Sequence, residues 1–346
     1  MKKVWMSLTL AGLLLTAAGC GGNGSGGEQA GGTEQSGGSA AGKAYTVAIS
    51  QIVEHPSLDE TRRGFLAGLK DAGIEEGKNL TVDYNNAQGD ATTNLSIAQK
   101  IADSDSDLAL AIATPPAQAL VQQVQDKPVL FAAVTDPLGA KIVGDLEKPG
   151  ANVTGASDTN PEAVVQLMDF VASELPDVKT VGLILNEGEP NAVVMAENAE
   201  KALASHGIKL VKASVTNTSE VKQAADSLVG KADAFFITLD NTVVSAVDTI
   251  IQVANDNDIP FFSSDRDTVE KGAMATVGFK YYDHGYQVGQ MAAQILKDGA
   301  NPGDMPVSFP DKLDLILNVK AAKEQGVEVT DSMKSKVQDP DNNIIE

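Results

Sequence analysis

From Ala44 onward, short apolar segments alternate with segments that have the apolar periodicity of amphipathic helices. Strands that alternate with helices in this way form parallel sheets whose two faces are both covered by helices. The sequence therefore predicts an α/β fold. The segments that we predict to be strands are Tyr45–Ser50, Leu80–Tyr84, Leu108–Ala113, Val129–Val134, Thr180–Leu185, Lys209–Ser214, Ala234–Leu239, Pro260–Ser263 and Ala273–Phe279.

Three helix starts are indicated by local signals. The segment from Ser57 to Glu60 has the pattern of a capping box, in which two side chains satisfy each other's backbone N–H groups. Thr114 and Asn160 each precede a proline, and a polar cap followed by proline is typical of the first turn of a helix.

Two stretches of the chain repeat the same order of predicted elements. The first runs from Gly73 to Asp136, and the second runs from Gly207 to Asp265. Thr114 and Asp240 fall at equivalent positions in the two stretches, and Asp136 is equivalent to Asp265. We therefore predict two α/β lobes of similar topology.

Polar residues gather where the predicted strands end. Ligands of open parallel sheets bind at the carboxyl ends of the strands. We expect such residues from two facing lobes to line one cleft that clamps a small polar ligand. The candidates are His55, Thr114, Pro115, Thr135, Asp136, Asn186, Glu189, Asn191, Asp240, Asn241 and Asp265.

The charges of these candidates suit an amino-acid zwitterion. Asp240 and Asp265 would need a cation or hydrogen-bond donors at the floor of a cleft, and a ligand ammonium group is such a cation. Helix starts at Ser57, Pro115 and Pro137 would offer free N–H groups to a ligand carboxylate. Arg266 is the one arginine near a predicted strand end, so only Arg266 could clamp the carboxylate from there.

The sequence gives little support for catalysis. The three histidines, His55, His206 and His284, lack the spacing of metal ligands. The sequence from Ala44 onward contains neither the Gly-x-Ser-x-Gly motif of a nucleophile elbow nor a phosphate-binding loop. We expect a protein that is not an enzyme and that needs no cofactor or metal.

The N-terminus has the pattern of an export signal. Lys2 and Lys3 precede an apolar stretch that ends in small residues before Cys20, so residues 1–19 are predicted to be a signal peptide. Cys20 after small residues resembles the lipobox of bacterial lipoproteins, which implies a lipidated (palmitate-bearing) N-terminus. The alternative is a plain signal peptide with an incidental cysteine. Residues 20–43 are rich in Gly and Ser, and we predict a flexible linker there.

The charge of the chain argues against a nucleic-acid partner. The formal net charge is −21, and removal of Lys2 and Lys3 with the signal makes it −23. Such a surface repels a phosphate backbone. Outside the signal no apolar run reaches the ~18 residues of a membrane span. We therefore expect the protein to contact the cell membrane only through its lipid anchor, on the extracytoplasmic face. We also expect a monomer.

Several motifs across residues 44–330 resemble those of the substrate-binding lipoproteins of a bacterial ABC import system. The resemblance implies a type I periplasmic-binding fold, in which two three-layer αβα lobes with parallel sheets are joined by three crossovers. It places the N-terminal lobe at 44–157 plus 280–310 and the C-terminal lobe at 158–279 plus 311–346. The motifs are Glu54-His55-Pro56, Asn86-Ala87-Gln88-Gly89-Asp90, Ala113-Thr114-Pro115 with Ala117-Gln118, Val134-Thr135-Asp136-Pro137, Pro149-Gly150-Ala151-Asn152-Val153-Thr154-Gly155, Asp240-Asn241-Thr242, and Gly272-Ala273 before Tyr281-Tyr282.

The resemblance also implies a function. Members with a known ligand mostly bind tryptophan, tyrosine or phenylalanine, and an ABC permease in the membrane is the implied partner. Leu185 and Ala192 depart from the family pattern by removing two hydroxyl groups, which leaves the preferred ligand side chain open.

Two other functions are compatible with the same fold. A sugar or nucleoside ligand would use aromatic stacking and neutral amides and would not need Asp240 and Asp265. A surface adhesin, or an enzyme on this scaffold, is the third reading. Five aromatic residues are candidates for apolar walls of the cleft or for filling of the core: Phe131, Phe235, Phe236, Phe261 and Phe262.

Overall fold

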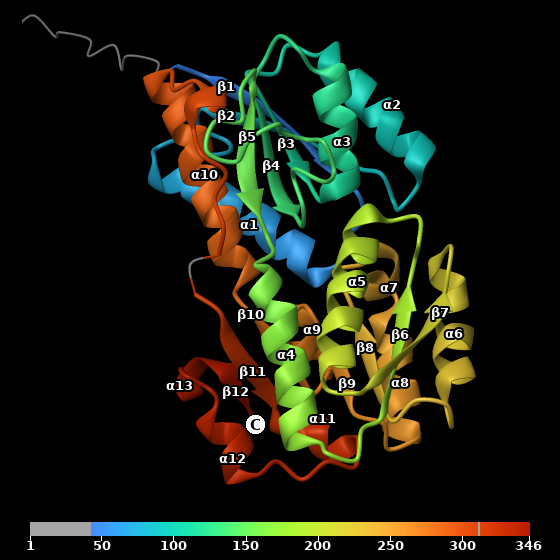
Figure 1. Cartoon of the computed structure of the whole chain (residues 1–346). Coiled ribbons are helices and arrows are strands. Elements are labelled where there is room, and N and C mark those ends of the chain that lie inside the picture. The colour runs from blue at the N-terminus through green and yellow to red at the C-terminus, as the bar shows by residue number, and fades with distance from the viewer. Residues whose placement is uncertain (1–42, 311) are drawn as a thin grey trace, which may run out of the picture. The chain divides into compact units, whose positions relative to one another are not determined.

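The computed structural model describes residues 43–310 and 312–346, which all belong to one compact unit. The predicted signal peptide, Cys20 and the linker up to residue 42 lie outside the described residues. Two separate sheets organise the described part of the chain (Figure 1). We call each sheet with its covering helices a lobe.

The N-terminal lobe contains five parallel strands in the order β2-β1-β3-β4-β5. Helices α1 and α10 lie on one face of this sheet, and α2 and α3 lie on the other (Figure 1). The elements are β1 (Tyr45–Gln51), α1 (Pro56–Asp71), β2 (Leu80–Asn86), α2 (Ala91–Ala102), β3 (Leu108–Ile112), α3 (Thr114–Gln123), β4 (Val129–Val134), β5 (Val153–Ser157), α10 (Tyr281–Asp298) and the 3-10 turn η2 (Pro302–Asp304).

The C-terminal lobe contains seven strands in the order β12-β11-β10-β9-β8-β6-β7. Helices α4 and α5 cover one face, and α6, α7 and α8 cover the other (Figure 1). The elements are α4 (Pro161–Glu174), β6 (Thr180–Leu185), α5 (Pro190–Ser205), β7 (Lys209–Ser214), η1 (Thr218–Glu220), α6 (Val221–Leu228), β8 (Ala234–Ile237), α7 (Asn241–Ser245), α8 (Val247–Asp256), β9 (Phe261–Ser263), α9 (Arg266–Lys271), β10 (Ala275–Gly278), β11 (Asp314–Asn318), α11 (Val319–Glu324), α12 (Asp331–Ser335), α13 (Pro340–Asn343) and β12 (Ile344–Ile345).

The predicted repeat is present in the sheets. Strands β2-β1-β3-β4-β5 of the first sheet correspond in order to β7-β6-β8-β9-β10 of the second. All nine predicted strands are found, with ends that differ by at most a few residues. The prediction missed β5, β11 and β12, and the pairing of β10 with β11 is antiparallel rather than parallel.

The chain passes between the sheets three times. It passes from β5 to α4, from β10 to α10, and from Ser308, which bridges to Ala156, to β11. Each lobe therefore carries the helix that follows the fifth strand of the other lobe. The predicted α/β fold of two lobes is confirmed, whereas the residue boundaries proposed for the lobes stay a prediction.

The aromatic candidates lie in the cores. Phe131 is buried in the N-terminal lobe. Because side chains of a strand alternate between faces, Phe235 and Phe261 fill the core on one side of the second sheet, while Phe236 and Phe262 fill the core on the other side. All five are at most 1% exposed, and none lines a cavity that is described below.

Helices α1 and α10 pack backbone to backbone through four glycines. Gly64 and Gly68 of α1 are four residues apart and face Gly285 and Gly289 of α10, which have the same spacing. A Cβ added at Gly285 would lie 2.0 Å from the carbonyl oxygen of Thr61, which is too close for any real contact. Only glycine permits this approach, and it fixes the two helices relative to each other.

We predict that Gly285→Ala destabilises the protein. The methyl group would push α10 away from α1, and overpacking of this kind costs about 1–3 kcal/mol. Alanine also brings a gain of about 1 kcal/mol to a helix interior, so we expect a net loss of up to about 2 kcal/mol. Urea unfolding measures the free energy of unfolding of both proteins.

Gly144→Ala is the matched control, because no atom lies within 4 Å of the position of its added Cβ. We expect this variant to stay within about 0.5 kcal/mol of the parent protein. A Gly285→Ala variant that is as stable as the Gly144→Ala variant would contradict the proposed contact.

Candidate functional site

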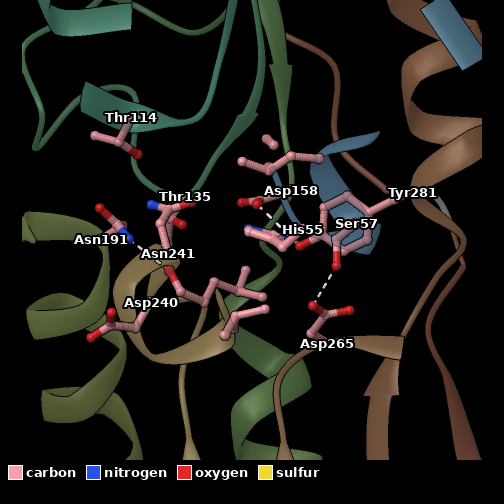
Figure 2. A pocket seen from close by; sticks show the side chains of 14 residues that line it. His55, Ser57, Thr114, Thr135, Asp158, Asn191, Asp240, Asn241, Asp265 and Tyr281 are labelled. Carbon is pink, nitrogen blue, oxygen red and sulfur yellow. Dashed lines mark hydrogen bonds between the residues drawn. The ribbon is translucent and has the colours of Figure 1, made fainter. Parts of the chain in front are cut away.

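A cavity of about 320 Å³ lies where the carboxyl ends of strands from both lobes meet (Figure 2). We call it the polar cavity. It is lined by His55, Ser57, Leu58, Thr114, Ala133, Thr135, Asp158, Asn191, Leu239, Asp240, Asn241, Val244, Asp265 and Tyr281.

Seven of the eleven predicted site residues line this cavity: His55, Thr114, Thr135, Asn191, Asp240, Asn241 and Asp265. Four do not: Pro115, Asp136, Asn186 and Glu189. The repeat and the positions of the strand ends therefore predict half of the residues that line the cavity. Several of these residues also hold the fold together through hydrogen bonds that the sequence did not indicate.

The start of α1 differs from the predicted capping box. Its N-cap is His55, and no side chain caps the helix. The hydroxyl of Ser57 instead donates to Asp265 Oδ2 of the other lobe, at 2.5 Å. The capping-box prediction was wrong, because Ser57 already lies inside the helix. The first turn of α1 thus lines the cavity without a side-chain cap on its N–H groups.

The start of α3 also differs from the prediction. Thr114 is the first residue of the helix, and its N-cap is Ala113, whose φ of 89° lies in the left-handed region. The Thr114 hydroxyl is buried and has no hydrogen-bond partner. Since Pro115 and Pro116 have no N–H, this helix start offers a ligand fewer donors than we expected.

No helix begins at Pro137, contrary to expectation. Residues 137–140 form a turn, in which Asp136 Oδ1 accepts from the Gly139 N–H at 2.8 Å. Asp136 lines a more open cavity at the rim, together with Leu138 and Phe309.

Asp240 and Asp265 each cap a helix. Asp240 accepts from the N–H groups of Val243 and Asn186, at 3.0 and 2.5 Å. Burial, together with the nearby carboxylate of Glu189, holds the pKa of Asp240 well above its ordinary value. Asp265 accepts from the Asp267 N–H at 2.7 Å besides the Ser57 hydroxyl. Both carboxylates therefore already have protein donors.

Glu189 fixes the start of α7 from behind the cavity. Its carboxylate accepts from the backbone N–H and side-chain amide of Asn241, and from the N–H and hydroxyl of Thr242, at 2.6–3.0 Å. It also accepts from the amide of Asn191 at 3.1 Å. Asn186 donates to the Thr242 hydroxyl at 3.0 Å. Glu189 and Asn186 thus hold the start of α7, where Asn241 lines the cavity. Neither Glu189 nor Asn186 lines the cavity itself.

Asp158 and Tyr281 are cavity residues that our site prediction missed. Asp158 is 6% exposed and accepts from the Tyr281 hydroxyl at 3.2 Å (Figure 2). It also accepts from the Thr159 hydroxyl at 3.2 Å. Burial raises the pKa of Asp158 from 3.8 to about 6. Asp158 follows β5 directly, so recognition of that strand would have made it a strand-end candidate.

Ala133 shapes the wall between Asp158 and α10. Its φ of 54° is unusual for a residue with a Cβ, and its N–H donates to His284 Nε2 at 3.0 Å. Burial lowers the pKa of His284 to about 4, so the imidazole is neutral near pH 7 and can accept this bond. The strained position is thereby held by a side chain of α10.

Three buried polar atoms at the polar cavity lack a partner: His55 Nδ1, Thr114 Oγ1 and Asn191 Oδ1. Buried side-chain polar atoms are hydrogen-bonded in the large majority of cases. Burial lowers the pKa of His55, which favours the neutral imidazole. Unpaired donors and acceptors of neutral groups converging on one cavity indicate a site for a polar ligand.

A second cavity of about 330 Å³ adjoins the first and shares Asp158 and Leu239 with it. We call it the apolar cavity, because most of its other walls are aliphatic or aromatic. The remaining lining residues are Thr159, Asn160, Ala163, Val164, Leu167, Met195, Ser264, Val277, Gly278, Phe279 and Leu313.

Arg266 does not serve the site as a carboxylate clamp. Its guanidinium donates to Glu270 Oε1, Asn343 Oδ1 and the Asn342 carbonyl, at 2.8, 2.5 and 2.7 Å. It therefore ties the C-terminal segment to α9. Within residues 43–310 and 312–346, no three potential ligands gather to hold a metal ion, and no helix is long and apolar enough to span a bilayer.

We predict that Asp158→Asn stabilises the ligand-free protein at pH 7.5. Folding raises the pKa of this carboxyl from 3.8 to about 6. The ionised carboxyl therefore lowers the free energy of unfolding fully above pH 6, and this cost is lost as the pH falls toward 3.8. Tyr281 faces the carboxyl, and its own raised pKa keeps its hydroxyl protonated. We expect a gain of up to about 3 kcal/mol at pH 7.5.

Urea unfolding of both proteins at pH 7.5 and at pH 4.0 measures this difference. The gain should shrink to about 0.5 kcal/mol at pH 4.0, because the Asp158 carboxyl is then protonated in the folded state and still partly ionised in the unfolded state, where its pKa is 3.8. Equal stabilities at pH 7.5 would show that Asp158 is not strained by burial.

Comparison with known proteins agrees with the two-lobed fold. Residues 46–339 match a family model described as ABC transporter substrate binding protein. A tyrosine-binding protein of Clostridioides difficile (strain R20291) is 38% identical over 281 residues, which is 81% of each chain. Solved solute-binding and sugar-binding proteins at 13–16% identity share the fold, with TM-scores of 0.56–0.61.

Two solved relatives differ in state. An ABC domain from Streptococcus pneumonia in complex with L-Trp is 31% identical and has a TM-score of 0.81, covering 88% of this chain and all of that one. A ligand-free, open substrate binding protein with adhesive properties from Clostridium difficile is 38% identical but has a TM-score of 0.64, covering 87% and 98%. Because the family model matches residues 46–339, the chain belongs to the ABC transporter substrate binding protein family.

Proposed function

We propose that this protein captures an aromatic amino acid between its two lobes and delivers it to a membrane permease. The observation that carries the proposal is the pair of adjoining cavities. One is polar and contains unpaired buried groups, and the other is largely apolar. An amino acid with a large apolar side chain has the same division into a polar and an apolar part.

The start of α1 suits the ligand carboxylate. This helix of 16 residues has no side-chain cap, and Ser57 and Leu58 of its first turn line the polar cavity. Free N–H groups and the positive end of the helix dipole favour a carboxylate there. The unpaired atoms His55 Nδ1 and Thr114 Oγ1 line the same cavity and can complete the hydrogen bonds.

The relatives support the aromatic class of ligand. One is named for tyrosine binding, and another was solved with L-Trp. The departures from the family pattern at Leu185 and Ala192 do not weaken this assignment, because both residues are buried and line neither cavity.

Lobe closure would provide the affinity. In this structure Ser57 of one lobe already donates to Asp265 of the other. A ligand that contacts both lobes favours the closed arrangement by its better binding to it. Binding and release, rather than catalysis, are the function that we assign.

The family works outside the cytoplasm, and we propose that Cys20 carries the lipid that keeps this member there. A linker of about 24 residues would give a root-mean-square reach of roughly 25–30 Å. The binding unit would then stay near its permease, at a raised local concentration.

We predict that an aromatic amino acid stabilises the protein against heat, whereas sugars and nucleosides do not. Ligand at 100 times its dissociation constant adds about 2.7 kcal/mol to the free energy of unfolding. A thermal-shift screen of the twenty amino acids, with sugars and nucleosides as comparison ligands, measures this. The sole tryptophan is Trp5 in the predicted signal, so titration of the mature protein with L-Trp can be followed by ligand emission. A shift with sugars alone would overturn the proposal.

Replacement of Cys20 should release the protein from the membrane. In cells that express the full chain, we expect the parent protein in the detergent-soluble membrane fraction and Cys20→Ala in the aqueous fraction. Ser25→Ala, in the predicted linker, is the control and should stay with the membrane. Membrane retention of Cys20→Ala would contradict lipid anchoring and would leave the ligand assignment untouched.

A further inference from the structure

Asp158 lies where the two cavities meet. The linings of the two cavities have two residues in common, Asp158 and Leu239. Of these two residues, Asp158 is the charged one. It follows β5 at the first passage between the lobes, and its partner Tyr281 begins α10 after the second passage. The carboxylate therefore lies at the hinge and faces the ligand site.

Among the acidic residues at the site, Asp158 alone has only neutral hydroxyl donors. Asp240, Asp265 and Glu189 each accept from backbone N–H groups at helix starts. Asp158 accepts from two hydroxyls at 3.2 Å, and an ionised carboxylate has about four acceptor sites. The described part of the chain gives it no cationic partner within 4.0 Å. A buried carboxylate without a cation is unfavourable, so a cationic ligand group would be strongly favoured there.

We propose that Asp158 accepts the ammonium group of the ligand, and that the ligand side chain then enters the apolar cavity. This inference rests on the proposed function and replaces Asp240 and Asp265 as the ammonium acceptors that the sequence indicated. The carboxylate of the ligand points to the start of α1 in the polar cavity.

The position of Asp158 determines the direction of the side chain. The ammonium and the side chain of an amino acid are bonded to the same carbon, so the side chain must enter a cavity that adjoins the ammonium site. The apolar cavity shares Asp158, whereas the rim cavity near Leu138 and Phe309 does not. Val164, Leu167 and Phe279 then provide contacts for an aromatic ring.

Ser264 gives the apolar cavity a polar end. Its hydroxyl is buried, lines the cavity and has no partner. A phenol or an indole N–H can hydrogen-bond to it, but a phenyl ring cannot. Because an unpaired buried hydroxyl is costly, Ser264 should favour tyrosine or tryptophan over phenylalanine.

Removal of either charge tests the ammonium contact. Calorimetric titration of the parent protein and of Asp158→Asn uses two probe pairs: L-tyrosine with 3-(4-hydroxyphenyl)propanoate, and L-tryptophan with 3-(indol-3-yl)propanoate. Each second probe lacks the ammonium group. We expect the parent protein to bind the amino acid roughly 30-fold or more tightly than the analogue. In Asp158→Asn that preference should fall below about 3-fold, through loss of amino-acid affinity.

Asp136→Asn is the matched control, because Asp136 is an acidic residue near the site that lines neither cavity and its turn can be kept by asparagine. It should change affinity by less than about 2-fold, as is usual for a rim charge. An unchanged preference in Asp158→Asn, while the parent protein still binds the amino acid, overturns the role of Asp158 alone. A parent protein that binds neither amino acid overturns the proposed function as well.

Ser264→Ala tests the direction of the side chain independently. We expect the ratio of L-tyrosine affinity to L-phenylalanine affinity to fall about 5-fold or more, since the variant can no longer bond the phenol. Thermal unfolding confirms that the variant is folded. A ratio that does not change places the ring outside the apolar cavity and overturns that half of the inference.

Discussion

The close contact of α1 with α10 determines where the functional groups lie. Helix α10 follows β10 of the C-terminal lobe, yet it packs through Gly285 and Gly289 on Gly64 and Gly68 of α1. Both helices begin at the polar cavity, so this contact sets the position of the first turn of α1 relative to Tyr281. Tyr281 in turn donates to Asp158 at the hinge. A change in the spacing of α1 and α10 would therefore shift Tyr281 and its contact with Asp158 at the ligand site.

The alternation of strands and helices was predictable because it follows from local patterns. Apolar runs that are buried on both faces are recognisable in the sequence, and the repeat of β2, β3 and β4 in β7, β8 and β9 follows from them. The missed strand β5 reads Val-Thr-Gly-Ala-Ser, with little apolar character. It is buried because β4, α10 and η2 pack against it, which no local signal reveals.

The errors at the site have a common physical cause. A capping signal predicts a helix start by assuming that the protein satisfies its own N–H groups. At α1 and α3 the polar side chains serve other purposes: Ser57 contacts the opposite lobe, and the hydroxyl of Thr114 is left without a partner. Conversely, Asp240 and Asp265 looked free for a ligand but cap helices. Sequence position indicated which residues reach the strand ends, whereas only the fold showed which of them remain available.

In the proposed complex, the two cavities receive the two halves of an amino acid, with Asp158 between them. A crystal structure of the protein with L-tyrosine measures this most directly. We expect the ligand nitrogen within hydrogen-bond distance of the Asp158 carboxylate, about 2.7–3.2 Å, and the ring among Val164, Leu167 and Phe279. A ligand nitrogen bound to Asp240 or Asp265, with its ring toward Leu138 and Phe309, would contradict it.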